Sequence, residues 1–479
     1  MEQSVTKRIA KNFTWLSIGD LLARGINFLA IIYMARVLGA AAFGVLNFAQ
    51  AFLAYLLLFV DSGLSMLGTR EIAKQREKAG SISLNIFAIR LLIALIVFVV
   101  SIVILLFIPL SLEMRLLFTF TFLFVFHRAL NADWVYQGLE RMEYISIARV
   151  AGSLLAFIAT ILIIKTSGDL IKVPLIQFVS GFLVSLFFLY WLFKKFTPYN
   201  LSHLNPTNWW DYFYEAMPLG ASVILIQIYY NLDTIMLGFM DKQEVVGYYN
   251  AAYKIFFAVL AILSLWQSTA FPVVSKRMSE DREKAEKFLN KYLRLTMLVA
   301  LPIVLLITFL SPWIIYLFYG SAYQSASTAL QILIWSTILI VISGVYGILI
   351  MIPLGKSREF LYGVGSGALM NIILNIILIP RFSFIGAAVA TLLSEAMVTV
   401  VMFYLIRKEI RINIFVNSWI PVFASVIASA LFCIFFQYGS VWLKIISSSI
   451  IFSITYILII LMLGEKRFLE EFVLEITRK

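Results

Sequence analysis

The sequence predicts an all-α integral membrane protein, and three observations carry that prediction. Of the 479 residues, 62% are hydrophobic and only 13% are charged, whereas soluble globular proteins are roughly half apolar and about a quarter charged. Apolar runs recur along the chain with lengths of 20 residues or more, and a helix needs about 20 such residues to span a bilayer. Lys and Arg residues gather in the short polar segments between alternate runs, as the positive-inside rule requires.

Fourteen apolar runs are long enough to be transmembrane helices. Strands of a transmembrane barrel would instead show about ten residues of alternating polarity. A backbone in lipid must satisfy its own hydrogen bonds, and long helices do so. In chain order, the expected spans are residues 13–35, 42–66, 84–108, 114–138, 145–166, 171–196, 217–240, 248–273, 292–319, 326–352, 359–379, 384–406, 417–438 and 441–464.

The basic residues orient these spans. With the N-terminus inside, 26 Lys and Arg residues lie at the expected cytoplasmic ends and loops, seven lie on the opposite side and five lie within spans. A miscounted helix would invert this alternation downstream. We therefore expect a multi-pass protein of the cell (inner) membrane with both termini in the cytoplasm. The first run holds Asp20 and Arg24 and has no small-residue cleavage site, so it is expected to be retained as a span.

An internal repeat divides the spans into two lobes. Leu-Gly followed by Gly-x-x-Asn-x-Ala occurs at Gly39 and Gly44 and again at Gly238 and Gly247. The second copy lies six spans after the first, and an even number of spans preserves orientation, so the repeat is expected to be parallel about an axis along the membrane normal. The expected parts are an N-terminal six-helix lobe (1–196), a cytoplasmic interfacial linker (197–216), a C-terminal six-helix lobe (217–406), two additional helices (407–464) and a cytoplasmic amphipathic tail (465–479).

Composition excludes several other classes of function. The net charge is +12, but the basic residues are spread through short loops and form no domain that would lie on nucleic acid. The single cysteine, Cys433, and two distant histidines, His127 and His203, do not make a zinc site. No Walker A or Gly-rich phosphate loop is present. We expect no cofactor, no metal and no catalysis.

Cations inside the spans are candidate functional residues, because a charge at the bilayer centre costs about 2.5–3.5 kcal/mol on insertion scales. Arg90 and Arg149 lie near cytoplasmic ends, where their side chains are expected to snorkel. Arg24 follows Asp20 by one turn, so an intrahelical ion pair is the alternative to a role in a cavity. Lys254 lies well inside its span.

The acids inside the spans fall into two groups. Asp61 and Asp133 lie close to cytoplasmic ends and are expected to pair with loop arginines. Glu395 is mid-span with no basic residue within a turn, so it is the first candidate for binding a driving proton or cation. Asp233 is the second candidate.

Several segments together resemble one family of transporters. The order and spacing of these segments are similar to the polysaccharide transporters of the multidrug/oligosaccharidyl-lipid/polysaccharide exporter superfamily, and within it to Wzx-type flippases of O-antigen and capsule repeat units. The segments are RVLGAAAFGVLNFA, DWVYQGLERMEYI (133–145), NLDTIMLGF, GYYNAAYKI, FPVVSK and NIILNIILIPRFSFIGAAVATLLSE.

The resemblance implies a substrate, a mechanism and a site. An undecaprenyl-diphosphate-linked oligosaccharide would move from the cytoplasmic to the outer leaflet by alternating access, coupled to protons or sodium in some members. The fold would be a V-shaped pair of lobes around a hydrated, partly cationic cavity, whose cations carry over to Arg24, Arg128 and Lys254. Arg24 and Lys254, one from each lobe, would contact the diphosphate from opposite sides. A polysaccharide polymerase and a chain-length regulator are expected partners, besides membrane lipid.

Three alternatives stay open at this point. A drug/cation antiporter of the same superfamily would need acidic cavity residues, for which Glu395 or Asp233 would serve. A lipid II flippase shares the fourteen-span plan. A membrane enzyme such as a sugar polymerase usually carries a large external loop, and none is expected here.

Overall fold

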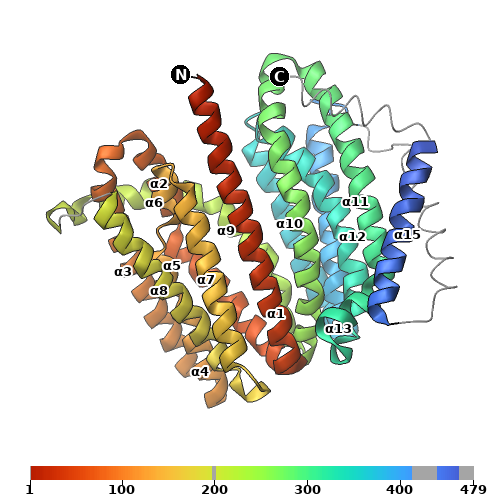
Figure 1. Ribbon diagram of the computed structural model, residues 1–479, viewed down its shortest axis with the longest axis horizontal. Coiled ribbons are helices and arrows are strands. Elements are labelled where there is room, and N and C mark those ends of the chain that lie inside the picture. The colour runs from red at the N-terminus through yellow and green to blue at the C-terminus, as the bar shows by residue number, and fades with distance from the viewer. Residues whose placement is uncertain (1, 197–200, 413–439, 463–479) are drawn as a thin grey trace. The chain divides into compact units, whose positions relative to one another are not determined.

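The computed structural model describes residues 2–196, 201–412 and 440–462, and these residues form helices joined by short turns (Figure 1). Contacts divide the chain into two compact units, residues 1–238 and 239–479. Within the described residues, nine helices are long and apolar enough to cross a membrane. The expected all-α class is confirmed, whereas the fourteen-span count stays a prediction.

Unit 1 is built around a very long first helix, α1, which packs along α7. Shorter helices α4, α5 and α6 pack beside α8, α1 and α7 (Figure 1). The helices of this unit are α1 (Glu2–Asp61), α2 (Leu64–Lys74), α3 (Ala79–Phe107), α4 (Leu112–Phe122), α5 (Phe124–Leu130), α6 (Asp133–Gly138), α7 (Met142–Ile163), α8 (Lys172–Lys195) and α9 (Trp209–Met240).

Unit 2 is centred on α12, which contacts α10, α11 and α13. The end of α12 continues as a buried π-helix, Val345–Met351, a rare geometry that is frequent at functional sites. The other helices of this unit are α10 (Gln243–Glu280), α11 (Arg282–Tyr319), α12 (Ala326–Gly344), α13 (Ser357–Ile406) and α15 (Val441–Met462).

Two helices each hold a pair of expected spans across a kink. In α1 the kink is at Gly39, whose φ of 77° suits a residue without a Cβ. In α13 it is at Ser383, whose φ of 55° is unfavourable for a residue with a side chain. The Ser383 hydroxyl donates to Asp241 Oδ2 at 2.5 Å, and this bond helps to hold the turn.

The expected span 114–138 is not one helix, so this expectation needs correction. The helix is interrupted between α4 and α5 and again at Asn131, whose backbone is extended. The side chain of Asn131 accepts a hydrogen bond from the N–H of Asp133 at 3.0 Å. Such side-chain bonding to nearby backbone competes with helix formation. The expected span 417–438, the tail 465–479 and residues 197–200 of the linker lie outside the described residues.

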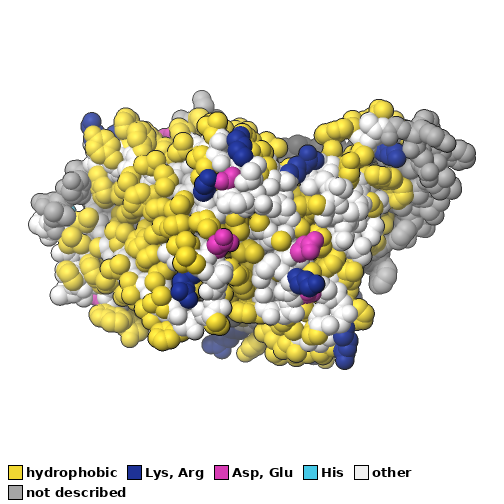
Figure 2. Space-filling view, turned by 90° about the horizontal axis from the view of Figure 1, so that it is seen from below, with side chains coloured by type: hydrophobic (Ala, Val, Ile, Leu, Met, Phe, Trp, Pro, Cys, Tyr) yellow, Lys and Arg dark blue, Asp and Glu magenta, His cyan; other side chains and the backbone are white. Residues whose placement is uncertain are grey.

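The outer surface is apolar over long stretches of helix. On α3, Leu95, Val99 and Val103 expose between 46% and 51% of their area. Exposure of apolar side chains along the side of a helix is unfavourable in water and suits contact with lipid. Figure 2 looks onto the ends of the helices, where hydrophobic side chains cover one side of the view and polar surface with several charged groups occupies much of the rest.

Candidate functional site

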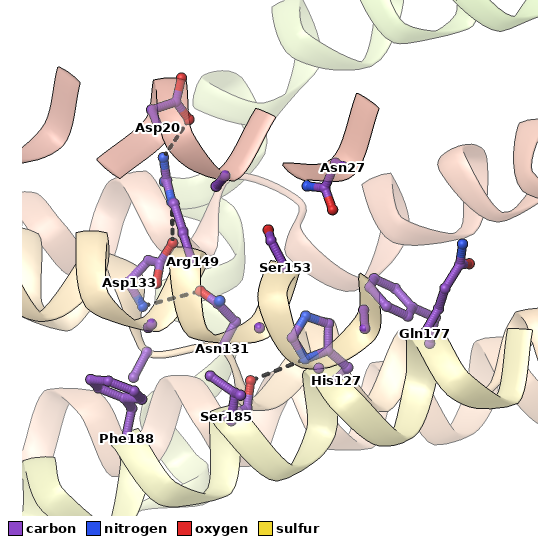
Figure 3. A pocket seen from close by; sticks show the side chains of 18 of the residues that line it. Asp20, Asn27, His127, Asn131, Asp133, Arg149, Ser153, Gln177, Ser185 and Phe188 are labelled. Carbon is purple, nitrogen blue, oxygen red and sulfur yellow. Dashed lines mark hydrogen bonds and ion pairs between the residues drawn. The ribbon is translucent and has the colours of Figure 1, made fainter. Parts of the chain in front are cut away.

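Unit 1 has a partly open cavity of about 430 Å³ among its helices. Its lining residues come from α1, α5, α6, α7, α8 and the turn at Asn131. Figure 3 shows charged side chains gathered at one end of this cavity and His127, Ser185 and Gln177 toward the other. We call it the polar cavity.

The charged end of the polar cavity is a chain of ion pairs between two carboxylates and two guanidinium groups. Asp20 on α1 accepts from Arg24 Nε at 2.6 Å and from Arg149 Nη1 at 3.1 Å. Arg149 on α7 also bonds Asp133 of α6 through Nε at 3.1 Å (Figure 3). Two carboxylates thus face two guanidinium groups, so the network carries no net charge.

The other walls of the polar cavity are neutral and polar. His127 Nδ1 lies 3.0 Å from the hydroxyl of Ser185 on α8. Gly181 makes this approach possible, because a Cβ there would lie 2.9 Å from that same ring nitrogen. Gln177 accepts from Gln50 Nε2 at 3.2 Å. Ser153 is 8% exposed, and its hydroxyl has no hydrogen-bond partner within the described part of the chain.

A second cavity of about 310 Å³ adjoins the first, because Phe124, His127 and Asn131 line both. We call it the arginine cavity. Its charged wall is Asp61, which lies 3.5 Å from Arg128 Nη2 and 3.5 Å from Arg90 Nη2. One carboxylate therefore faces two guanidinium groups, which leaves one positive charge. The side chain of Arg128 is 42% exposed.

The turn after α1 places Asp61 in this wall. Ser62 and Gly63 have φ values of 42° and 83°, and the Ser65 hydroxyl donates to Asp61 Oδ1 at 2.5 Å. Gly63 has no room for a side chain, because a Cβ would lie 2.3 Å from the carbonyl oxygen of Ala216 on α9. The close approach of α9 therefore requires glycine at this turn.

Two expectations about these charges were wrong. Arg90 does not snorkel: its side chain is only 1% exposed and donates to the carbonyl oxygens of Arg128 and, at 3.3 Å, of Asn131. Asp61 and Asp133 do pair with arginines, but these arginines lie within α3, α5 and α7 and not in loops. Spacing along one helix does not reveal such partners, because they come from other helices.

In unit 2, Lys254 lies on α10 and is half-buried. Its side chain has no ion pair or hydrogen bond with any residue that the structure describes. It therefore differs from Arg24 and Arg128, which both have carboxylate partners. The structure brings Arg24 and Arg128 to the two adjoining cavities of unit 1.

The two acidic candidates are buried. Asp233, on α9 of unit 1, is 3% exposed, and Glu395, on α13 of unit 2, is 5% exposed. The helix turns on either side of Glu395 bond neighbouring helices: Thr391 lies 3.3 Å from the hydroxyl of Tyr249 on α10, and Thr399 donates to the carbonyl oxygen of Leu339 on α12 at 3.1 Å. These contacts fix α13 against both helices.

Comparison with known sequences identifies the family. Residues 9–278, more than half of the chain, match the sequence model described as polysaccharide biosynthesis protein. The chain belongs to this family. Residues 218–377 also match the MatE model, and membership of the superfamily that the sequence resembles is confirmed.

Three curated relatives match over most of their own length. A protein of Escherichia coli (strain K12), named provisionally as an O-antigen transporter, is 24% identical over 79% of this chain and 91% of its own. A protein of Haloferax volcanii, named provisionally as a low-salt glycan biosynthesis flippase, is 25% identical over 88% of this chain and 89% of its own. The capsular polysaccharide biosynthesis protein of Staphylococcus aureus is 21% identical over 84% of this chain and all of its own, 100%.

Solved structures share the fold. A lipid II flippase in an inward closed conformation aligns with a TM-score of 0.73 and 16% identity over 94% of this chain and 99% of its own. An inward-facing multidrug resistance MATE family transporter aligns with a TM-score of 0.69 and 18% identity over 83% of this chain and 97% of its own. This family member is therefore a multi-pass membrane protein with the transporter fold.

Sequence reasoning did not find the neutral residues of the polar cavity. A signal was present: Gln177, Gly181 and Ser185 recur every fourth residue, so they share one face of an otherwise apolar helix. Ser153 likewise follows Arg149 by one turn. Small and amide side chains are common on the packed faces of transmembrane helices, so this face alone did not predict a cavity.

Proposed function

We propose that this family member is a flippase that moves an undecaprenyl-diphosphate-linked oligosaccharide from the cytoplasmic to the outer leaflet of the cell membrane. The observation that carries the proposal is the family match over residues 9–278. Relatives named for O-antigen transport and glycan flipping support it. The protein would act as a transporter by alternating access and not as an enzyme, with both termini in the cytoplasm.

The physical task fits the two cavities of unit 1. A diphosphate bearing sugars is too polar to cross about 30 Å of hydrocarbon unaided. A guanidinium group offers phosphate a bidentate match, and the neutral polar groups beside it would replace water around the sugars. The prenyl chain would stay in lipid.

We propose Arg128, Lys254 and Arg24 as ligands of the diphosphate. Lys254 has the strongest claim, because no described residue pairs with it. Arg128 is half-exposed, and it shares its carboxylate with Arg90. Arg24 already bonds Asp20 at 2.6 Å, so its contribution should be the smallest.

Coupling to a proton or sodium gradient is also proposed, with Glu395 and then Asp233 as the coupling acids. Both are buried carboxylates in apolar helices, and acids within membrane spans are candidates for ion coupling. Glu395→Gln would then change the dependence of transport on pH or sodium, and unchanged dependence would leave Glu395 a structural residue. A polysaccharide polymerase and a chain-length regulator remain the proposed protein partners.

A drug/cation antiporter is the second candidate, favoured by the match of residues 218–377 to the MatE model. Such a transporter needs carboxylates free to bind a cation. The acids of the polar cavity, Asp20 and Asp133, are both engaged by arginine, which favours the flippase. A lipid II flippase shares the fold and differs in its substrate.

The function is tested in cells that lack their own repeat-unit flippase. Expression of the chain should restore export of lipid-linked repeat units and leave resistance to cationic drugs unchanged. A gain of drug resistance without export would support the antiporter instead. Restored growth on loss of the lipid II flippase would assign cell-wall precursor as the substrate.

A further inference from the structure

The two adjoining cavities of unit 1 differ in charge. The polar cavity balances Asp20 and Asp133 against Arg24 and Arg149. The arginine cavity sets Asp61 alone against Arg90 and Arg128. A dianionic group is therefore favoured in the second cavity and gains little in the first.

The polar cavity is suited to a neutral ligand rich in hydroxyl groups. Its volume of about 430 Å³ lies within the range of about 300–1,000 Å³ of small-molecule sites. Ser153 has a hydroxyl that bonds no described residue. Gln177 uses its carbonyl oxygen on Gln50, so its amide hydrogens remain to donate.

Aromatic rings form the apolar part of the wall of the polar cavity. Phe124, Tyr136 and Phe188 line the polar cavity. The hydroxyl of Tyr136 donates to the carbonyl oxygen of Phe188 at 2.7 Å, which fixes that ring. Tyr136 is buried and stacks on Tyr144 with ring centroids 5.1 Å apart, so these rings form an apolar wall behind the few polar groups, as is usual in small-molecule sites.

We propose that the polar cavity is a saccharide subsite, which holds the first sugars of the substrate while the arginine cavity holds its diphosphate. The shared wall of Phe124, His127 and Asn131 would face the linkage between sugar and phosphate. The inference rests on the proposed flippase function and deepens it. It assigns selectivity for sugars to unit 1.

The test compares three lipids on the purified full chain in nanodiscs, by native mass spectrometry. The lipids are undecaprenyl diphosphate, the same lipid with one N-acetylhexosamine, and the same lipid with three sugars. Two or more added hydrogen bonds should make the wild type bind the three-sugar lipid about tenfold more tightly than the bare diphosphate.

Gln177→Leu and Ser153→Ala should each reduce this gain from about tenfold to about threefold, because each removes one of the added hydrogen bonds, and should leave the affinity for bare undecaprenyl diphosphate unchanged. Arg128→Ala should lower the affinity for all three lipids by the same factor. Gln331→Leu makes the same chemical change at a half-buried glutamine of α12 in unit 2 and should keep the gain. Ser153→Ala removes a single atom, so it tests the proposal even where Gln177→Leu misfolds.

Two results overturn the subsite alone: equal wild-type affinity for the three lipids, or the full gain retained in both Gln177→Leu and Ser153→Ala. Failure of the wild type to bind any of the three lipids overturns the proposed function, and the subsite with it. The two failures are thus distinguishable.

Discussion

The two units treat charge inside their helices in different ways. In unit 1, six charged side chains from α1, α3, α5 and α7 meet in ion pairs around Asp20 and Asp61, and cavities lie beside them. In unit 2, Lys254 lies among packed helices without an ionic partner in the described chain. The charges of unit 1 are therefore neutralised largely within the protein by these ion pairs, which we call the polar frame. Lys254 of unit 2, in contrast, is available to pair with a ligand.

The largest expected effect comes from breaking the buried part of that frame. Arg90→Met should lower the free energy of unfolding by about 3 kcal/mol, because it strips a partner from Asp61 and two carbonyl oxygens in a water-poor site. Thermal unfolding in detergent measures the loss. Arg149→Met is the matched control: its side chain is 41% exposed, so its pairs should contribute less than about 1 kcal/mol. Equal losses would contradict the buried frame.

Lys254 should behave in the opposite sense. Lys254→Met should reduce export of lipid-linked repeat units at least about tenfold, the value of one charge-assisted bond to phosphate. Its melting temperature should stay the same or rise, because a half-buried ammonium group without a partner costs free energy. Lys242→Met, at an exposed loop position, should change neither. Normal export, or a marked loss of stability, would show that Lys254 is an ordinary structural residue.

The kinks of the two long helices allow a smaller test. Gly39→Ala should lower the free energy of unfolding by about 1–3 kcal/mol from backbone strain alone, because its φ of 77° and ψ of 170° suit only glycine and a Cβ there would meet no atom within 4 Å. Ser383→Gly should be nearly neutral, since relief at φ 55° offsets the lost bond to Asp241. Differential scanning fluorimetry compares the two, and a larger loss in Ser383→Gly would reverse this account of the kinks.

The smallest effect on stability is expected just after α13, at an ion pair of unit 2. Glu409 bonds Lys356 Nζ at 2.8 Å and Arg282 at 3.3 Å, and the bond to Lys356 holds the pKa of Glu409 below its ordinary value. A lowered folded-state pKa stabilises the fold above the unfolded pKa of about 4.3, and this stability is lost as pH falls through the folded pKa.

Melting temperatures measured from pH 7 to pH 3 test this ion pair. Glu409→Gln should melt slightly below the wild type at pH 7, and the two should converge in acid. Glu283→Gln removes an exposed pair with Lys287 and serves as the control. A melting-temperature difference between Glu409→Gln and the wild type that grows toward pH 3 would contradict a lowered pKa of Glu409.

Much of the fold was predictable from sequence because lipid imposes long apolar helices. The limits of α3, α7 and α8 lie within a few residues of the expected spans 84–108, 145–166 and 171–196. The break in span 114–138 does carry a sequence signal, because His127, Arg128, Asn131 and Asp133 interrupt the apolar run around the turn that Asn131 holds.

The candidate site was predictable only in part. Arg24, Arg128 and Asp133 were singled out because charge is conspicuous in an apolar run, and the pair of Asp20 and Arg24 was foreseen as an alternative. The pairing of Arg149 with both Asp20 and Asp133 was not, since it depends on how α1, α6 and α7 pack. Neutral residues such as Gln177 are not revealed by the pattern of charges along the sequence.

The most direct test of the flippase function is transport in proteoliposomes. Undecaprenyl diphosphate bearing three sugars is placed in the inner leaflet, and its arrival outside is followed by binding of an added lectin. The wild type should expose the sugars faster than protein-free liposomes, and the Arg128→Ala, Lys254→Met double variant should not. Exposure at the protein-free rate with correctly inserted wild-type protein would contradict the account.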